Sequence, residues 1–246
     1  ILNGTVQLTL IVTSAAPCVT VTDTMELTII PEVIASAGPD TSMCQNIPAT
    51  IAGSSAFNYS SITWTHNGTG TLLNPTDIHP TYVAGPGETG VIILTMTVRS
   101  IAPCIDSIVD QLNLTIWPLP TGTLSGNSVV CENDTVVMSL TFTGTPPISV
   151  TFTNGQDTTT ISGIMSSPYA ISIIPPVGVW TYTLIALNDL HCDAPPNNLL
   201  GSALITVFAQ PAVEFWWEFG SQNYEIVFHA DTSVIDFGAI GNMFQW

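Results

Sequence analysis

The sequence predicts an all-β protein built from small β-sandwich domains in tandem. Thr, Val, Ile, Ser, Gly and Pro dominate the chain, and no apolar pattern with a helical period persists. Short segments instead alternate apolar and polar residues, with Gly, Pro and Asn turns between them. A third observation, an internal repeat, groups these strands into domains of one plan.

The repeat is clearest in residues 4–18 and 90–104, which align without a gap at an offset of 86 residues. Both segments carry apolar residues at alternate positions and end in Ala-Pro-Cys, as expected for a strand with one buried face. The match continues beyond the cysteine. We therefore expect residues 1–32 to be the C-terminal end of a truncated repeat and residues 33–119 to be a complete β-sandwich.

A second complete sandwich is predicted over residues 120–210. Tyr182 precedes Cys192 by ten residues, as Leu94 precedes Cys104, and both lie on an alternating strand. We expect Tyr182 to lie in the core of this domain.

Further strands are expected within both domains, at residues 49–51, 62–64, 136–142, 148–152, 180–184 and 204–207. Trp64 lies on one of them and is expected in the core, as is usual for a sandwich. Asn67-Gly68 predicts a type I′ hairpin turn. Residues 211–246 are expected to be the N-terminal part of another truncated domain.

Five cysteines indicate an oxidising compartment. Spacings of 60 and 61 residues predict one disulfide inside each domain, Cys44–Cys104 and Cys131–Cys192. Closing a loop of this length would stabilise a domain by roughly 4 kcal/mol. The repeat places the partner of Cys18 upstream of the chain.

The charge is one-sided, with 18 acidic residues against a single basic one and a net charge of −17. Nucleic-acid binding needs clustered Lys and Arg, so it is excluded as a function. No run is apolar enough to cross a bilayer, and we expect no membrane insertion in this segment. A surface of Thr, Ser and Asn suits an extracellular protein.

No catalytic motif appears, and the four histidines are scattered along the chain. The sequence therefore predicts no enzyme and no cofactor other than calcium. Asp40, Asp106 and Asp110 are the candidate calcium ligands, because this ion prefers oxygen donors. Solvated carboxylates in turns are the alternative, and the residue pattern favours them.

Several motifs in the chain also resemble those of a known family. Ala37-Gly38-Pro39-Asp40 with Cys44, followed by Ile62-Thr63-Trp64 and Ala102-Pro103-Cys104, resembles the PKD-like repeats of giant Bacteroidota cell-surface proteins of the gliding-adhesin, SprB-like kind. Residues 120–210 resemble the Ig-like repeats of the same proteins, and residues 211–246 the start of a PKD domain. The resemblance implies tandem Ig-like and PKD-like sandwiches arranged in a rod.

The resemblance further implies type IX secretion, a cell-surface location and a role in adhesion, gliding or filament formation. It implies no catalytic residue. The implied partners are neighbouring domains, copies of the same protein and surface polysaccharide. This group glycosylates Asp-Ser/Thr-apolar motifs, and the matching acceptors are Thr24, Ser107, Thr135 and Thr158.

The leading hypothesis is thus a non-enzymatic structural segment of a large extracellular adhesin, stalk or filament. The alternative is a set of carbohydrate- or ligand-binding accessory modules from a secreted multidomain hydrolase. An exposed aromatic platform would favour the alternative, whereas polar Thr/Ser sheet faces would favour the structural segment.

Overall fold

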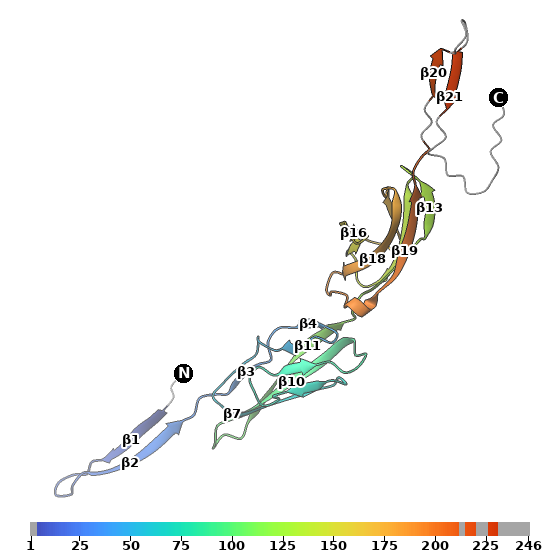
Figure 1. Cartoon of the computed structure of the whole chain (residues 1–246). Helices are drawn as coiled ribbons and strands as arrows, with labels where there is room; N and C mark the ends of the chain where they lie inside the picture. Colours follow the sequence, from blue (N-terminus) through green and yellow to red (C-terminus); the bar gives the residue numbers. More distant parts are fainter. Residues whose placement is uncertain (1–3, 212–214, 220–225, 231–246) are drawn as a thin grey trace. The chain divides into compact units, whose positions relative to one another are not determined.

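The computed structural model describes residues 4–211, 215–219 and 226–230, and nearly all of its regular elements are strands (Figure 1). The one helical element in these ranges is the 3-10 turn η1, Pro196–Asn198. The all-β prediction is therefore confirmed. The chain divides into two compact units, residues 1–119 and 120–246.

The first unit begins with an antiparallel hairpin of β1 (Gly4–Val12) and β2 (Val21–Ile29). Its alternating apolar side chains, which the sequence pattern assigns to a buried face, are exposed; Leu8 is 46% and Leu10 65% accessible. The assignment of this hairpin to a truncated repeat stays a prediction.

The body of the first unit is a two-layer sandwich. One sheet has the order β4-β11-β10-β7, and the remaining strands form the sheets β5-β9-β8 and β3-β6. The strands are β3 (Ile34–Ser36), β4 (Thr41–Cys44), β5 (Ala49–Thr50), β6 (Ser55–Phe57), β7 (Tyr59–His66), β8 (Thr71–Leu73), β9 (Thr81–Val83), β10 (Gly90–Ser100) and β11 (Ser107–Trp117).

The core of this sandwich follows the two-residue period of the sequence. Trp64 is 3% exposed, and Leu94 and Met96 on β10 are fully buried beside it in one apolar cluster. The residues that alternate with them on the same strands are half-buried or exposed, as alternation in a half-buried sheet requires.

The β10–β11 hairpin reproduces the β1–β2 hairpin at the level of the backbone. Gly90 lies opposite Ile116 as Gly4 lies opposite Ile29. At the tips, the cysteine N–H donates to the carbonyl three residues earlier in both hairpins, over 3.2 Å for Cys18 and 3.1 Å for Cys104. The repeat seen in the sequence thus has a structural counterpart.

The second unit is also a sandwich. Its strands follow the path β16-β15-β18-β19-β12-β14-β17, with β13 paired to β19. They are β12 (Thr121–Ser125), β13 (Ser128–Cys131), β14 (Val136–Thr143), β15 (Ile148–Thr153), β16 (Thr158–Ile164), β17 (Tyr169–Ile173), β18 (Gly178–Asn188) and β19 (Leu199–Phe208). Tyr182 is 7% exposed and belongs to its core.

Strand β19 connects the two layers of the second unit. Its first residues pair with β12 and its last residues with β13. Gly201, at the bend, has φ +74°, and a Cβ there would lie 2.2 Å from the Leu124 carbonyl oxygen. Only glycine fits this position, because it tolerates both the backbone conformation and the close approach.

The predicted type I′ hairpin at Asn67-Gly68 is wrong. Neither residue has a positive φ, and β8 pairs with β9 rather than with β7. The chain crosses from one sheet to the other here, and the Asn67 Oδ1 accepts a hydrogen bond from the Ile93 N–H at 2.8 Å.

Of the predicted truncated domain over residues 211–246, the structure describes β20 (Phe215–Phe219) and β21 (Ile226–Ala230), which pair antiparallel. The remainder of that prediction lies outside the described residues.

Candidate functional site

The two cysteines of each domain lie at opposite ends of it. We call the end where the chain enters a domain its leading end, and the end where it leaves its trailing end. In the first unit Cys44 lies opposite Trp117, the last residue of β11, at the trailing end. Cys104 lies in the loop before β11 begins at Ser107, at the leading end.

This placement contradicts the predicted Cys44–Cys104 disulfide. The 11 residues of β11 separate the two ends by about 36 Å. A disulfide needs Cα atoms roughly 4.4–6.8 Å apart. Cys104 accordingly carries a free, exposed thiol, whereas Cys44 takes part in a disulfide.

The second unit repeats this arrangement, so the predicted Cys131–Cys192 disulfide is also wrong. Cys131 lies opposite Phe208, the last residue of β19, and carries a free, exposed thiol. Cys192 precedes β19, is 3% exposed and takes part in a disulfide. Cys18, at the tip of the first hairpin, is a third free thiol.

The trailing ends of both domains are built alike. A four-residue strand ending in cysteine runs parallel to the end of the last strand, β4 beside β11 and β13 beside β19. The next residue closes the ladder. The Gln45 N–H donates to the Trp117 carbonyl at 2.9 Å, and the Glu132 N–H donates to the Phe208 carbonyl at 2.8 Å.

The leading end of the second unit is held by Asp189. Its carboxylate accepts the N–H groups of Thr145 at 2.8 Å and of Cys192 at 2.6 Å. Pro120, where the chain enters, accepts a hydrogen bond at its carbonyl from the Asn198 side chain at 3.0 Å. Cys192 is thereby fixed in the loop at this end.

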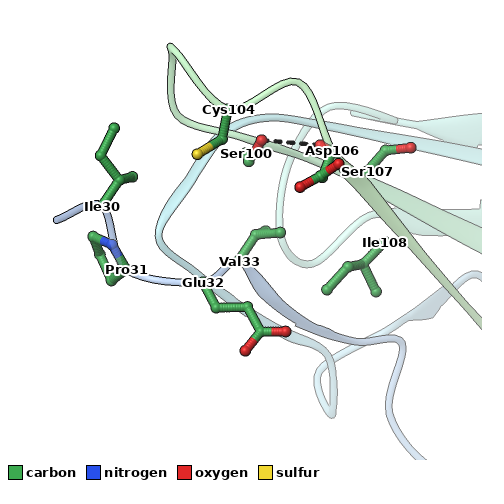
Figure 2. A pocket seen from close by; sticks show the side chains of 9 residues that line it. All are labelled: Ile30, Pro31, Glu32, Val33, Ser100, Cys104, Asp106, Ser107 and Ile108. Atoms are coloured by element: carbon green, nitrogen blue, oxygen red, sulfur yellow. Dashed lines mark hydrogen bonds between the residues drawn. The ribbon is translucent and has the colours of Figure 1, made fainter.

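The leading end of the first unit contains a cavity of about 570 Å³ (Figure 2). Its lining combines the incoming chain with the tip of the β10–β11 hairpin. The lining residues are Ile30, Pro31, Glu32, Val33, Ser100, Cys104, Asp106, Ser107 and Ile108. The Ser100 hydroxyl donates to the Asp106 carbonyl at 3.0 Å, which shapes the loop that carries Cys104.

A polar latch, formed by Tyr82 and Glu88, closes the turn at residues 68–70. The Glu88 carboxylate accepts the Thr69 N–H at 2.6 Å, the Gly85 N–H at 2.7 Å and the Tyr82 hydroxyl at 2.9 Å. The Tyr82 oxygen in turn accepts the Gly70 N–H at 3.0 Å. Sequence reasoning missed this contact, because it joins two loops that only the fold brings together.

The latch shifts the pKa values of both groups. Burial raises the pKa of Tyr82 to about 12, and its hydrogen bond to the Glu88 carboxylate contributes to the rise. Partial burial opposes ionisation of Glu88, but the N–H groups of Gly85 and Thr69 and the Tyr82 hydroxyl outweigh it. The pKa of Glu88 therefore lies below its ordinary value. These shifts mark a structural carboxylate, which is ionised at neutral pH.

Ser54, which is buried, and His79, which is exposed, resemble part of a catalytic dyad but join two loops. The Ser54 hydroxyl donates to the Ile78 carbonyl at 2.6 Å, and it is 5% exposed. The His79 Nδ1 lies 3.2 Å from that hydroxyl and 3.1 Å from the Ile51 carbonyl, which can only accept. The Ser54 hydroxyl and the His79 ring thus both contact backbone carbonyl groups, and these contacts hold residues 51–54 against residues 78–79.

Two of the three predicted calcium ligands bind the backbone instead. The Asp110 carboxylate accepts the Ala37 N–H at 2.8 Å. Asp40 accepts the Asn113 side-chain and backbone N–H groups at 3.0 and 2.8 Å, which hold the pKa of Asp40 below its usual value. No three His, Cys, Asp or Glu side chains gather into a metal-binding group within the described part of the chain. The calcium site stays a prediction.

The four predicted glycosylation acceptors all have exposed side chains: Thr24, Ser107, Thr135 and Thr158. Exposure is what a modified hydroxyl requires, and the modification itself stays a prediction.

Paired hydroxyl groups cover parts of the outer sheet faces. Thr151 and Thr160 lie 2.9 Å apart across β15 and β16, and Thr121 and Thr143 lie 2.8 Å apart across β12 and β14. Trp180 is only half-exposed, and its indole N–H donates to the Pro176 carbonyl at 2.8 Å. Such faces offer hydrogen-bonding groups rather than an aromatic platform.

No family model and no curated protein matches the chain. Similar solved structures include the fibronectin(III)-like modules of Clostridium thermocellum CbhA, at 16% identity over 72% of this chain and 95% of that chain, with a TM-score of 0.34. Drosophila OTK extracellular domains 3–5 match at 12% identity over 84% and 71%, with a TM-score of 0.41.

Another similar structure is Bacteroides ovatus SGBP-B in complex with a mixed-linkage heptasaccharide, at 14% identity over 89% of this chain and 56% of that chain, with a TM-score of 0.25. At such identities the likeness concerns the fold alone, and the Ig-like sandwich class stands on the strands and cores described above. No helix among the described residues is long and apolar enough to cross a membrane.

Proposed function

We propose that this chain is a non-enzymatic structural segment of a large extracellular protein, in which the sandwich domains form part of a stalk, adhesin or filament. The observation that carries the proposal is the distribution of side chains. The aromatic residues Trp64 and Tyr182 are buried in the cores, whereas paired Thr and Ser hydroxyls cover outer sheet faces. The disulfide and the net charge of −17 suit an extracellular setting.

The strand arrangement also supports a mechanical role. Each domain pairs an early strand in parallel with its last strand, over four residue pairs, at β4–β11 and at β13–β19. Tension applied to the two ends of a domain pulls these partners past each other along their length. The ladder hydrogen bonds then bear the load together rather than one after another, because they run across the strands.

Single-molecule force spectroscopy on the reduced chain tests this role. We expect two unfolding events, each releasing about 300 Å of chain, since roughly 85–90 residues extend at about 3.5 Å each. Gln45→Pro removes the N–H that donates to the Trp117 carbonyl, so it should lower the unfolding force of the first domain only. The second domain serves as the internal control. A chain that extends without force peaks would contradict the mechanical role.

The resemblance to PKD-like and Ig-like repeats supports a finer proposal, namely export by type IX secretion to the surface of a Bacteroidota cell, with sugars on Thr24, Ser107, Thr135 and Thr158. Antibodies against the chain should label intact cells of the source organism, and mass spectrometry should find added mass on these residues. Labelling that needs permeabilised cells would overturn the surface location.

The competing role, as a carbohydrate-binding accessory module, is separable from the structural one. A glycan array with the full chain distinguishes them, since the structural role predicts no bound oligosaccharide. Micromolar binding to one glycan class would favour the accessory module.

A further inference from the structure

Two of the free thiols, those of Cys104 and Cys131, lie at positions whose counterparts in the other domain are disulfide-bonded. Cys131 ends β13 beside Phe208, as the disulfide-bonded Cys44 ends β4 beside Trp117. The hydrogen bonds that follow the two cysteines agree as well. Asp134 and Ile47 each donate an N–H at 3.2 Å to the cysteine carbonyl three residues earlier. The backbone thus presents Cys131 in the same way as a cysteine that forms a disulfide.

At the leading ends the relation is reversed, because the first domain has the free thiol and the second domain has the disulfide-bonded cysteine. Cys104 precedes the last strand of its domain, as the disulfide-bonded Cys192 precedes β19. Cys104 also lines the cavity together with the incoming chain at residues 30–33, so it lies on the side from which a preceding domain is joined (Figure 2). The two disulfide-bonded cysteines are one trailing cysteine and one leading cysteine.

We propose that the disulfides of this protein join consecutive domains rather than close individual ones. The trailing cysteine of each domain bonds to the leading cysteine of the domain that follows it. Cys131 therefore forms a disulfide with the leading cysteine of the following domain. Cys104 forms one with the trailing cysteine of the preceding domain. This inference rests on the proposed function only in that the domains stand in tandem within a longer chain.

The chemistry is a two-electron oxidation by a disulfide-bearing oxidant. One cysteine thiolate attacks a sulfur of the oxidant, and the second displaces it, forming the new S–S bond. Both electrons and the two thiol protons leave with the oxidant as two thiols. Glutathione disulfide serves as this oxidant in the experiment below.

Such a bond would also restrain domains that stand in tandem. A bond inside a domain would restrain only the loop that it closes, whereas a bond between consecutive domains restrains the linker and limits rotation of one domain against the next. Short linkers such as residues 118–120 make a bond between consecutive domains feasible. Only a few residues of chain separate the last strand of one domain from the first strand of the next.

The test is the full chain with its two-domain block duplicated, so that residues 1–210 are followed directly by residues 31–246. After refolding with reduced and oxidised glutathione, free thiols are counted by alkylation and bonds are mapped by mass spectrometry without reduction. The original chain has three free thiols. Independent blocks would give five, since the added block contributes a second Cys104 and a second Cys131.

The proposal predicts three free thiols in the duplicated chain, because the first Cys131 bonds to the second Cys104. A cross-linked peptide containing these two residues should appear. Cys131→Ser in the first block should free the second Cys104 and give four thiols. Cys18→Ser is the matched control and should lower the count by one while the cross-link remains.

Five free thiols in the duplicated chain, or a bond from Cys131 to Cys192 of its own domain, would overturn the proposal. Either outcome leaves the stalk function standing, since the reduced chain is the one tested by force. Loss of the force peaks would instead remove the mechanical role without affecting the mapped bonds.

Discussion

The latch between Glu88 and Tyr82 gives the most quantitative prediction about this fold. Glu88→Gln keeps the size of the side chain but replaces one carboxylate oxygen by an NH₂ group. Of the N–H groups of Thr69 and Gly85, which lie 2.6 and 2.7 Å from different oxygens, one then loses its acceptor and faces a donor. Hydrogen bonds to a charged group contribute roughly 1.5–3 kcal/mol each.

We expect Glu88→Gln to lower the free energy of unfolding of the first domain by about 2 kcal/mol at pH 7, because partial exposure lets water replace part of the lost bond. Hydrogen exchange followed by mass spectrometry measures this value for peptides of the first domain separately. Glu26→Gln, which removes an exposed carboxylate from β2, is the matched control and should have little effect.

The pH dependence provides a second, independent readout. The pKa of Glu88 is lower in the folded protein than its ordinary value of 4.5. Its stabilising contribution is therefore fully present above that value and is lost as the pH falls through the folded pKa. The difference between the original chain and Glu88→Gln should shrink below pH 4.5. A difference under about 0.5 kcal/mol at pH 7, or one unchanged at pH 3, would show that the Glu88 carboxylate does not stabilise the first domain.

Three further substitutions test the packing. Gly201→Ala should destabilise the second domain by more than about 2 kcal/mol in urea unfolding, since its Cβ would meet the Leu124 carbonyl at 2.2 Å and φ is +74°. Leu94→Ala should cost the first domain about 3 kcal/mol in the same assay, because the side chain is fully buried. Ser54→Ala should cost about 1–2 kcal/mol, seen as a lower melting temperature, since it removes the buried hydroxyl that donates to the Ile78 carbonyl at 2.6 Å.

The β-sandwich architecture was predictable because it rests on a local pattern. Alternation of apolar and polar residues along β10 determines which face is buried, and Leu94 and Met96 lie in the core as that pattern requires. The gapless match between residues 4–18 and 90–104 likewise reflects two hairpins with the same register.

The disulfide pairing was not predictable from spacing along the chain. Nearly equal separations of 60 and 61 residues indicate that two domains share a plan, but they do not show at which end of a sandwich each cysteine lies. That depends on the parallel pairing of β4 with β11, which joins residues about 70 apart in sequence. The length of one strand argues against a Cys44–Cys104 bond. Cys104 and Trp117 lie at opposite ends of β11, and Cys44 lies beside Trp117.

The turn at Asn67-Gly68 and the contacts of Glu88 could not be predicted for a related reason. Asn67-Gly68 has the composition of a hairpin turn, yet the chain changes sheets at this point, and the surrounding sandwich overrides the local preference. The Glu88 carboxylate binds N–H groups of loops at residues 69 and 85, and no local sequence pattern signals that contact.

Alkylation of the native, unreduced chain, followed by mapping of the labelled peptides, tests directly whether each domain keeps its two cysteines at opposite ends. We expect label on Cys18, Cys104 and Cys131 and protection of Cys44 and Cys192. A peptide in which Cys44 is bonded to Cys104, or Cys131 to Cys192, would contradict it.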